Sequence, residues 1–389
     1  MNIAPSNLYW SLPTPSKFLG SLTAGVGLPR AAAISFPRRM PSGTTDALRR
    51  ALEAADARLV VIEVGAGTDV AMEVGAQLNK ASVTGRELAS AKEPGGLFVL
   101  LKPTEERAAG NCGQYFESFV EALEVANGNV ALLVQVHNEA KEWKERAGMR
   151  VVEFDFALPY DEMTAYVGLR MLGRHGPGST SLLRALVTEY AGFDVVMAER
   201  LMSLTASDLL RLPQSLDAIL ADDPLRWRTP SWLEGSWSNN ERHPLTEWYL
   251  AIHDGPQQKQ AKQDSHRRYW RACIKALTPW LEERRDPVMK VLGRVIDHVY
   301  ASAGGVVTRP IGRGRTVEVK RDELEYNNIV GFANDNLLPP LQREDERRAV
   351  DVCYRAKAVR DDLAHLRAPS VAEVDNLVAA MDALFPARP

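Results

Sequence analysis

The segment AAAISF (Ala31–Phe36) decides how the first half of this chain folds, because it opens a series of short apolar runs. The later runs are LVVIEV (Leu59–Val64), LFVLL (Leu97–Leu101), VALLVQV (Val130–Val136) and VVEFDF (Val151–Phe156). Most of them are continuously apolar, which is typical of strands in a sheet that is covered on both faces. Helical patterns lie between them, for example over Thr44–Ala55 and Tyr115–Ala126. This alternation predicts an α/β domain with a doubly wound parallel sheet.

Length and composition are those of an ordinary globular protein of two or three domains. The chain has 389 residues, of which 45% are hydrophobic and 25% are charged, and its formal net charge is −3. These values exclude the disordered, collagen-like and coiled-coil classes. The longest purely apolar run, Leu97–Leu101, is too short to span a membrane. A net charge of this size gives no general attraction to nucleic acid.

Two features of the sequence indicate the cellular compartment. The N-terminus MNIAPSNLYW has no basic stretch leading into an apolar one, so no signal peptide is expected. The three cysteines, Cys112, Cys273 and Cys353, are odd in number and far apart, which fits a reducing environment better than a disulfide framework. The sequence therefore predicts a cytoplasmic protein.

The domain organisation predicted from these patterns has four parts. Residues 1–160 form the α/β domain, and 161–212 form a small helical lid that begins with Asp161 as its N-cap. Residues 213–265 form a connector in which Trp227, Trp232, Trp237 and Trp248 stand among Pro, Ser, Asn and Gly. Its tryptophans are expected to hold it against the neighbouring domains.

The fourth part, residues 266–389, is expected to be an α-helical bundle with one inserted β-hairpin. The hairpin is predicted over Gly304–Val319, and the first helix is expected to break near Pro279 and Pro287. Ser370 and Glu373 have the spacing of a capping box, so the last helix is expected to begin there. The fold class predicted for the whole chain is thus α/β plus all-α.

The loop after the first expected strand is where a nucleotide-binding α/β domain holds phosphates, with glycines, a lysine and a Ser or Thr. In this chain the loop reads PRRMPSGTT over 37–45. Gly43 and Thr45 fit the G-x-x-x-x-G-K-[ST] spacing, whereas Arg38 replaces the first glycine and Thr44 replaces the lysine. Arg38 and Arg39 are candidates to grip a phosphate, and the alternative is that they are ordinary surface arginines.

The third expected strand ends in Lys102-Pro103, without the acidic pair that would hold magnesium. In this pattern the N-terminal half resembles a degenerate P-loop NTPase of the AAA or STAND type with a helical lid. The resemblance implies that fold and argues against nucleotide hydrolysis.

No cofactor or metal site is expected from the rest of the sequence. The segment GRHGPGST (Gly173–Thr180) has phosphate-loop spacing but has Ser179 in place of the lysine and follows a helix. The segment VGAGTDV (Val64–Val70) lacks the third glycine of a dinucleotide fingerprint. The seven histidines are scattered without ligand spacing.

The sharpest motif is RAKAVRDDLAHLR (Arg355–Arg367). Arg360 stands beside an apolar stripe with helical spacing, so its guanidinium needs a partner or a function. His365 follows about 140° further around an ideal helix. Two copies packed around a dyad would therefore be needed to bring both groups to one point. The stripe consists of Val352, Cys353, Ala356, Val359, Leu363 and Leu366.

The pattern Arg360-Asp361-x-x-x-His365 resembles the R-x4–6-H signature of HEPN domains, α-helical bundles that are common in prokaryotic defence and toxin–antitoxin systems. The Leu-Ala-His ending is often seen in that family, and Asp361 is an accepted alternative to its frequent asparagine. Arg367 stands where one toxin subgroup has a tyrosine. The resemblance covers the C-terminal third of the chain.

What this resemblance implies is metal-independent cleavage of RNA by a homodimer. His365 would move the proton of the 2′-hydroxyl or of the leaving group, and Arg360 would neutralise charge in the transition state. Asp361 would orient one of these two side chains. The cationic residues Arg355, Lys357 and Arg367 would bind the RNA backbone.

Three interpretations of the whole protein stay open. In the first, the HEPN-like bundle is a ribonuclease effector and the α/β domain is a hydrolysis-dead sensor. In the second, the chain is a scaffold or adaptor of a defence complex that acts through protein contacts of the Trp-rich 213–255 region. Arg360 and Asp361 would then only crosslink helices, and His365 would be favoured by the helix dipole. In the third, the α/β domain is a switch that binds nucleotide without hydrolysing it.

Overall fold

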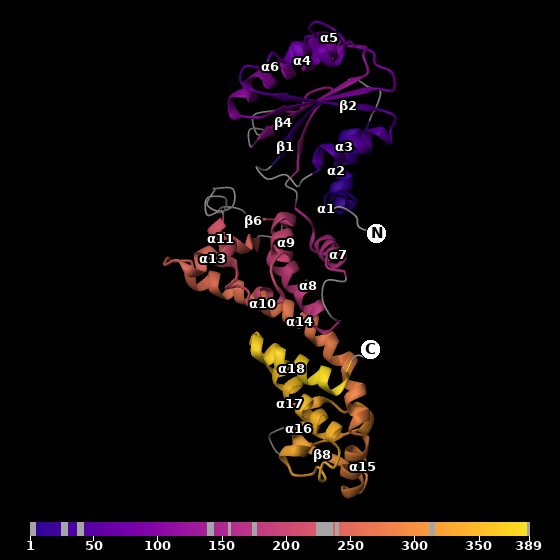
Figure 1. The fold of residues 1–389 in the computed structure, drawn as a ribbon, viewed down its shortest axis with the longest axis vertical. Coiled ribbons are helices and arrows are strands. Elements are labelled where there is room, and N and C mark those ends of the chain that lie inside the picture. Colours follow the sequence, from indigo (N-terminus) through magenta and orange to yellow (C-terminus); the bar gives the residue numbers. More distant parts are fainter. Residues whose placement is uncertain are drawn as a thin grey trace. The chain divides into compact units, whose positions relative to one another are not determined.

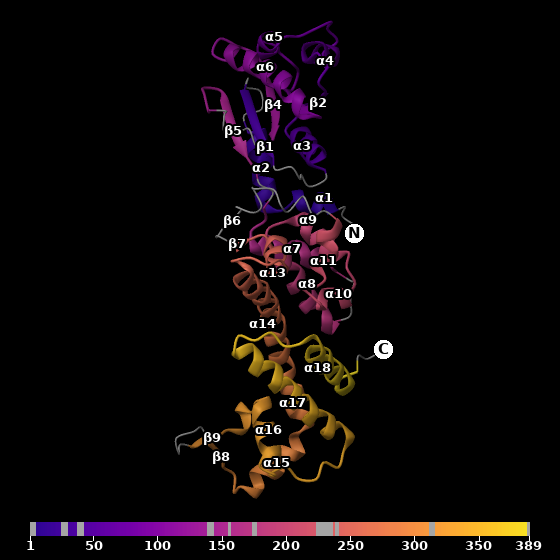
Figure 2. The ribbon, with the colours of Figure 1, turned by 90° about the vertical axis from the view of Figure 1, so that its left-hand side faces the viewer.

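A computed structural model describes residues 5–24, 30–36, 43–137, 144–154, 157–172, 177–222, 236–237, 241–310 and 316–386 (Figures 1 and 2). The chain divides into two compact units. Unit 1 consists of Met1–Tyr166 and Phe193–Val196, and unit 2 of Val167–Gly192 and Met197–Pro389.

Unit 1 is built on a five-stranded parallel sheet, so the predicted sheet is confirmed. Its order is β2-β3-β4-β1-β5, which puts the first strand inside the sheet between β4 and β5. The last strand begins two residues before the predicted start at Val151. The strands are β1 (Arg30–Phe36), β2 (Arg58–Val64), β3 (Leu97–Pro103), β4 (Val130–His137) and β5 (Met149–Glu153).

Helices cover both faces of this sheet (Figure 1). One face carries α4 (Val70–Gln77), α5 (Gly85–Ala89) and α6 (Glu106–Ala122), which share one apolar core with the strands. The opposite face carries α2 (Pro13–Thr23) and α3 (Thr44–Glu53), which follow the short α1 (Pro5–Trp10). Successive strand residues point to opposite faces, so the apolar runs fill both cores.

Unit 1 also contains the start of α7 (Tyr160–Arg170). The helix begins at Tyr160, so Asp161 lies in its first turn and is not the predicted N-cap. The neighbouring Glu162 accepts hydrogen bonds from the backbone N–H and the hydroxyl of Thr14, at 3.1 and 2.7 Å. The rings of Phe18 and Phe154 stack with centroids 4.1 Å apart. These contacts hold α2 in place.

Unit 2 is almost entirely helical. It contains the helices α8 (Pro177–Ala191), α9 (Val195–Met202, from Met197 on), α10 (Ala206–Leu210), α11 (Leu216–Asp222), α13 (Pro244–Ile252), α14 (Gln258–Val291), α15 (Gly293–Ser302), α16 (Tyr326–Asn334), α17 (Glu344–Ala364) and α18 (Val371–Leu384). Two small antiparallel pairs accompany them, β6 (Ser236–Trp237) with β7 (Glu241–Arg242) and β8 (Val307–Pro310) with β9 (Thr316–Val319). The second pair confirms the predicted hairpin.

The long helix α14 corrects one prediction. It runs without interruption through Pro279 and Pro287, where breaks were expected. A proline inside a helix removes one backbone hydrogen bond and costs about 3 kcal/mol. Buried side chains lie on both sides of the two prolines, including Leu277, Leu281 and Val288, and the burial of these side chains offsets that cost.

The C-terminal part of unit 2 is a bundle in which α17 packs against α14, α16 and α18. The last helix has the predicted capping box, in which Ser370 and Glu373 exchange hydrogen bonds. Within the Trp-rich segment, Trp248 donates to the carboxylate of Asp217 at 2.6 Å. Trp227 and Trp232 lie outside the described residues. The four-part division of the chain stays a prediction, and α14 runs continuously across its boundary at 265.

Candidate functional site

The RAKAVRDDLAHLR motif lies on the C-terminal half of α17 and just beyond its end. The predicted apolar stripe is buried from Val352 to Leu363 and packs inside the bundle. The indole N–H of Trp270, on α14, donates to the main-chain oxygen of Leu363 at 3.0 Å. This bond fixes the end of α17 against α14, next to His365.

Arg360 lies beside the stripe and reaches two carboxylates from two other elements. Its Nη1 donates to Oε2 of Glu325 at 2.7 Å, and its Nη2 lies 3.5 Å from Oε1 of Glu282. Glu325 is the N-cap residue of α16, and Glu282 belongs to α14. The Arg360 side chain is 31% exposed. The guanidinium therefore crosslinks α17, α16 and α14 near the bundle surface.

Two of these three helices, α16 and α14, are also joined by a second, buried contact. The hydroxyl of Tyr326, a fully buried residue at the start of α16, donates to the main-chain oxygen of Leu281 at 2.8 Å. Burial raises the pKa of this hydroxyl well above its usual range. Tyr326 follows Glu325 directly, and Leu281 precedes Glu282 directly, so this bond joins α16 and α14 right beside the two carboxylates that face Arg360.

His365 is the C-cap residue of α17 and is exposed to solvent. Its Nδ1 lies 2.7 Å from the main-chain oxygen of Asp361. A carbonyl oxygen only accepts hydrogen bonds, so this contact requires the proton on Nδ1 and leaves Nε2 of a neutral ring as a proton acceptor. Asp361 thus orients His365 through its backbone.

The other charged residues of the motif are paired with one another. The carboxylate of Asp361 accepts from Lys357, one turn earlier on α17. Arg355 pairs with Asp351 at 2.7 Å, and Arg367 pairs with Asp362 at 2.9 Å. The three residues expected to bind RNA are therefore each next to a carboxylate. Exposed pairs of this kind contribute at most about 1 kcal/mol, so a competing phosphate can exchange with them.

The sequence did not correctly predict two features of this region. Leu366 is 74% exposed and has φ 57°, although its helical spacing predicted a buried position. The helix ends at Ala364, so the periodicity that placed Leu366 in the stripe no longer applies to it. The pairing of Arg360 with Glu325 and Glu282 joins segments far apart in the chain.

The predicted phosphate loop follows β1, at the place where the chain leaves the inner strand for the far edge of the sheet. In open α/β sheets such a switch point is the usual ligand site. Gly43 is the N-cap of α3 with φ 84°, and Thr44 and Thr45 form the first turn. Arg38 and Arg39 lie outside the described residues. At the end of β3, Lys102 pairs with Glu63 at 3.2 Å.

Within the described part of the chain, no group of three or more His, Cys, Asp or Glu side chains has a geometry that could hold a metal ion. A search of the same residues finds no helix with the length and apolar character of a membrane span.

Comparison with known proteins finds limited similarity. No family model matches this chain, and no curated protein matches it. Among solved structures, a chain of "Structure of Drosophila ORC bound to poly(dA/dT) DNA and Cdc6 (conformation 1)" is 12% identical with a TM-score of 0.34, covering 99% of this chain and 73% of that one. A chain of "Structure of Drosophila ORC bound to GC-rich DNA and Cdc6" is 14% identical with a TM-score of 0.30, covering 95% and 69%. Similarities with TM-scores this low do not establish a shared fold.

Proposed function

We propose that this chain is a non-catalytic scaffold of a prokaryotic defence complex, built from a hydrolysis-dead NTPase-like α/β part and a HEPN-like helical bundle. The observation that supports it is the pairing of Arg360 with Glu325 and Glu282. A guanidinium that stabilises a phosphoryl transition state has to meet phosphate oxygens. Two carboxylates hold this one, and their negative charge opposes the approach of a phosphate.

The N-terminal part supports the same proposal. Thr44 stands where a phosphate loop needs its lysine, and it belongs to the first turn of α3. Lys102 and Pro103 end the third strand, where magnesium chemistry would need acidic residues. The lysine of the phosphate loop and the acidic residues after the third strand are therefore both replaced by other residue types, and the α/β part is assigned a structural or sensing role.

A double-mutant cycle tests the structural role of Arg360. We expect Arg360→Gln and Glu325→Gln to lower the free energy of unfolding with a coupling of about 0.5–1 kcal/mol, as partly exposed pairs do. Arg355→Gln is the matched control, since its pair with Asp351 lies within one helix and contributes about 0.3–0.5 kcal/mol. A coupling of zero between Arg360 and Glu325 would remove the support for the scaffold.

The second candidate is the metal-independent ribonuclease of a defence or toxin–antitoxin system, and a separate observation favours it. His365 is exposed, and the contact of its Nδ1 with Asp361 directs the accepting Nε2 away from the helix. A general base for the 2′-hydroxyl needs this tautomer. In this proposal two bundles dimerise, and Arg360 exchanges its carboxylates for the phosphate of RNA bound by Arg355, Lys357 and Arg367.

RNA cleavage in EDTA separates the two candidates. The full chain, His365→Ala and His298→Ala are compared, because His298 is another exposed histidine of unit 2 on a different helix, α15. The scaffold predicts no cleavage by any of the three. Cleavage that disappears in His365→Ala and persists in His298→Ala would replace the scaffold by the ribonuclease.

A further inference from the structure

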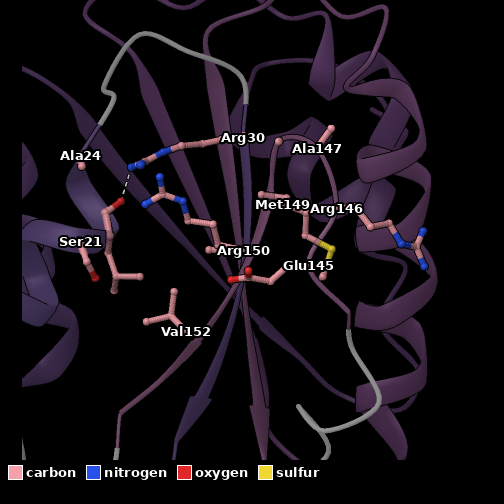
Figure 3. A pocket seen from close by; sticks show the side chains of 13 residues that line it. Ser21, Ala24, Arg30, Glu145, Arg146, Ala147, Met149, Arg150 and Val152 are labelled. Atoms are coloured by element: carbon pink, nitrogen blue, oxygen red, sulfur yellow. Dashed lines mark hydrogen bonds between the residues drawn. The ribbon is translucent and has the colours of Figure 1, made fainter.

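A pocket of about 720 Å³ lies in unit 1, beside the edge of the sheet formed by β1 and β5 (Figure 3). The end of α2 forms one wall with Ser21, Leu22 and Ala24. The strands contribute Arg30 and Arg150, whose side chains lie next to each other in Figure 3. The pocket is distinct from the phosphate loop, because Arg30 is the first residue of β1 and the loop follows its last.

The sheet register explains why two arginines share this pocket. Ala32 is the partner of Arg150 across β1 and β5, so Arg30 lies two residues earlier on the same face. With strands about 4.8 Å apart and a rise of about 3.3 Å per residue, the Cα atoms of the two arginines are roughly 8 Å apart. Both long side chains therefore reach the same space.

The charges of these two arginines are poorly compensated. Arg30 donates to the main-chain oxygen of Leu22, and its guanidinium lies 4.9 Å from the centre of the Phe98 ring. Its Nε is buried without a hydrogen-bond partner. Arg150 is exposed, and among the described residues no carboxylate pairs with it. Burial, and then the charge of Arg150, lower the pKa of Arg30 to about 10. The pocket thus holds a net positive potential.

The two other charged residues of the pocket have different roles. Arg146 forms an ion pair with Glu117 at 3.3 Å and points away from the two arginines (Figure 3). Glu145 lines the pocket with no ion pair to either arginine among the described residues. Its carboxylate is an acceptor for hydroxyl or amino groups of a ligand.

We propose that this pocket binds a small phosphomonoester whose carbon body carries hydroxyl groups. Guanidinium groups match the oxygens of a phosphate, and two of them suit a dianion. Ala32, Val152 and Leu22 supply an apolar wall for the carbon body, and Glu145 accepts from the hydroxyls. The volume is that of a small-molecule site and larger than a phosphate ion needs.

Calorimetric titration of the full chain with ribose 5-phosphate tests this proposal. Inorganic phosphate and ribose, which correspond to the two halves of this probe, are titrated separately for comparison. We expect ribose 5-phosphate to bind more tightly than either half. Arg150→Gln should weaken binding at least tenfold, because one charge-assisted contact is lost. Arg58→Gln, in β2 and outside the pocket lining, is the matched control and should bind as the unchanged chain does.

Three results would overturn the proposal. They are no binding of ribose 5-phosphate at millimolar concentration, equal binding of inorganic phosphate, and an equal loss in Arg58→Gln and Arg150→Gln. Arg150 is exposed, so its replacement should leave the thermal midpoint within about 2 °C of the unchanged chain. Arg30→Gln provides a second variant, for which the same loss of binding is expected if it folds.

Discussion

The buried ion pair of Arg268 and Glu247 gives the sharpest prediction about stability. Arg268, on α14, is 3% exposed, and Glu247, on α13, is 6% exposed. Two hydrogen bonds of 2.6 and 2.8 Å join the guanidinium to the carboxylate. A third bond of 3.1 Å runs from Arg268 to the main-chain oxygen of Glu189 on α8. One side chain therefore links three helices of unit 2.

Arg268→Met removes the charge and keeps most of the aliphatic stem. The carboxylate of Glu247 is then buried without its partner, which costs about 3–5 kcal/mol. For a cooperative unit of 150–250 residues, each kcal/mol shifts the melting temperature by about 2–4 °C. The expected fall in melting temperature is therefore roughly 6–20 °C.

Urea unfolding and calorimetry measure this loss. The double variant Arg268→Met with Glu247→Leu should regain most of the stability, because it removes both charges and fills the space with apolar atoms. Lys320→Met is the control, since its pair with Glu323 is exposed on both sides and should change the stability little. The reasoning is refuted if Arg268→Met costs less than 1 kcal/mol, or if the double variant is as unstable as the single one.

Two further predictions concern acid stability and glycine packing. The pair with Arg294 lowers the pKa of the buried Glu346 carboxyl from 4.5 to about 2, so its contribution is complete above about pH 4.5 and is lost as the pH falls toward 2. Glu346→Gln should flatten this part of the stability curve measured by urea unfolding, and parallel curves for the two proteins would contradict the assignment. In α4, Gly75→Ala should destabilise unit 1, because the new Cβ would lie 2.7 Å from the Cα of Ser82. Gly110→Ala, in α6 with open space around it, should instead stabilise unit 1 by up to about 1 kcal/mol. If both variants shift the melting temperature in the same direction, the close contact at Gly75 does not destabilise the Gly75→Ala variant.

Much of the fold could be predicted because its signals are local. Each strand of the sheet is a short and mostly continuous apolar run between helical patterns, and such a run can be recognised without knowing its partner strands. The β8–β9 hairpin and the capping box of Ser370 depend on neighbours within a few residues. The helix carrying Arg360 was located by the spacing of its buried residues.

Two predictions were wrong because a local pattern did not reveal tertiary packing or the exact end of a helix. Prolines predict a helix break through the loss of one hydrogen bond, yet α14 continues through Pro279 and Pro287 because it is packed on both sides of them. Leu366 has the spacing of a buried residue, yet it lies beyond the last turn of α17 and faces solvent. Packing decided the first outcome, and the position of the helix end decided the second.

Sequence patterns alone were enough to predict the parallel α/β sheet, the helical C-terminal part and the helix that carries Arg360 and is capped by His365. The groups that face these side chains became known from the packing of distant segments. Glu325 and Glu282 meet Arg360 because α16 and α14 pack against α17, and Arg30 meets Arg150 because β5 returns beside β1. Local sequence patterns specify helices and strands, whereas the partners of a charged side chain depend on which helices and strands, far apart in the sequence, pack side by side.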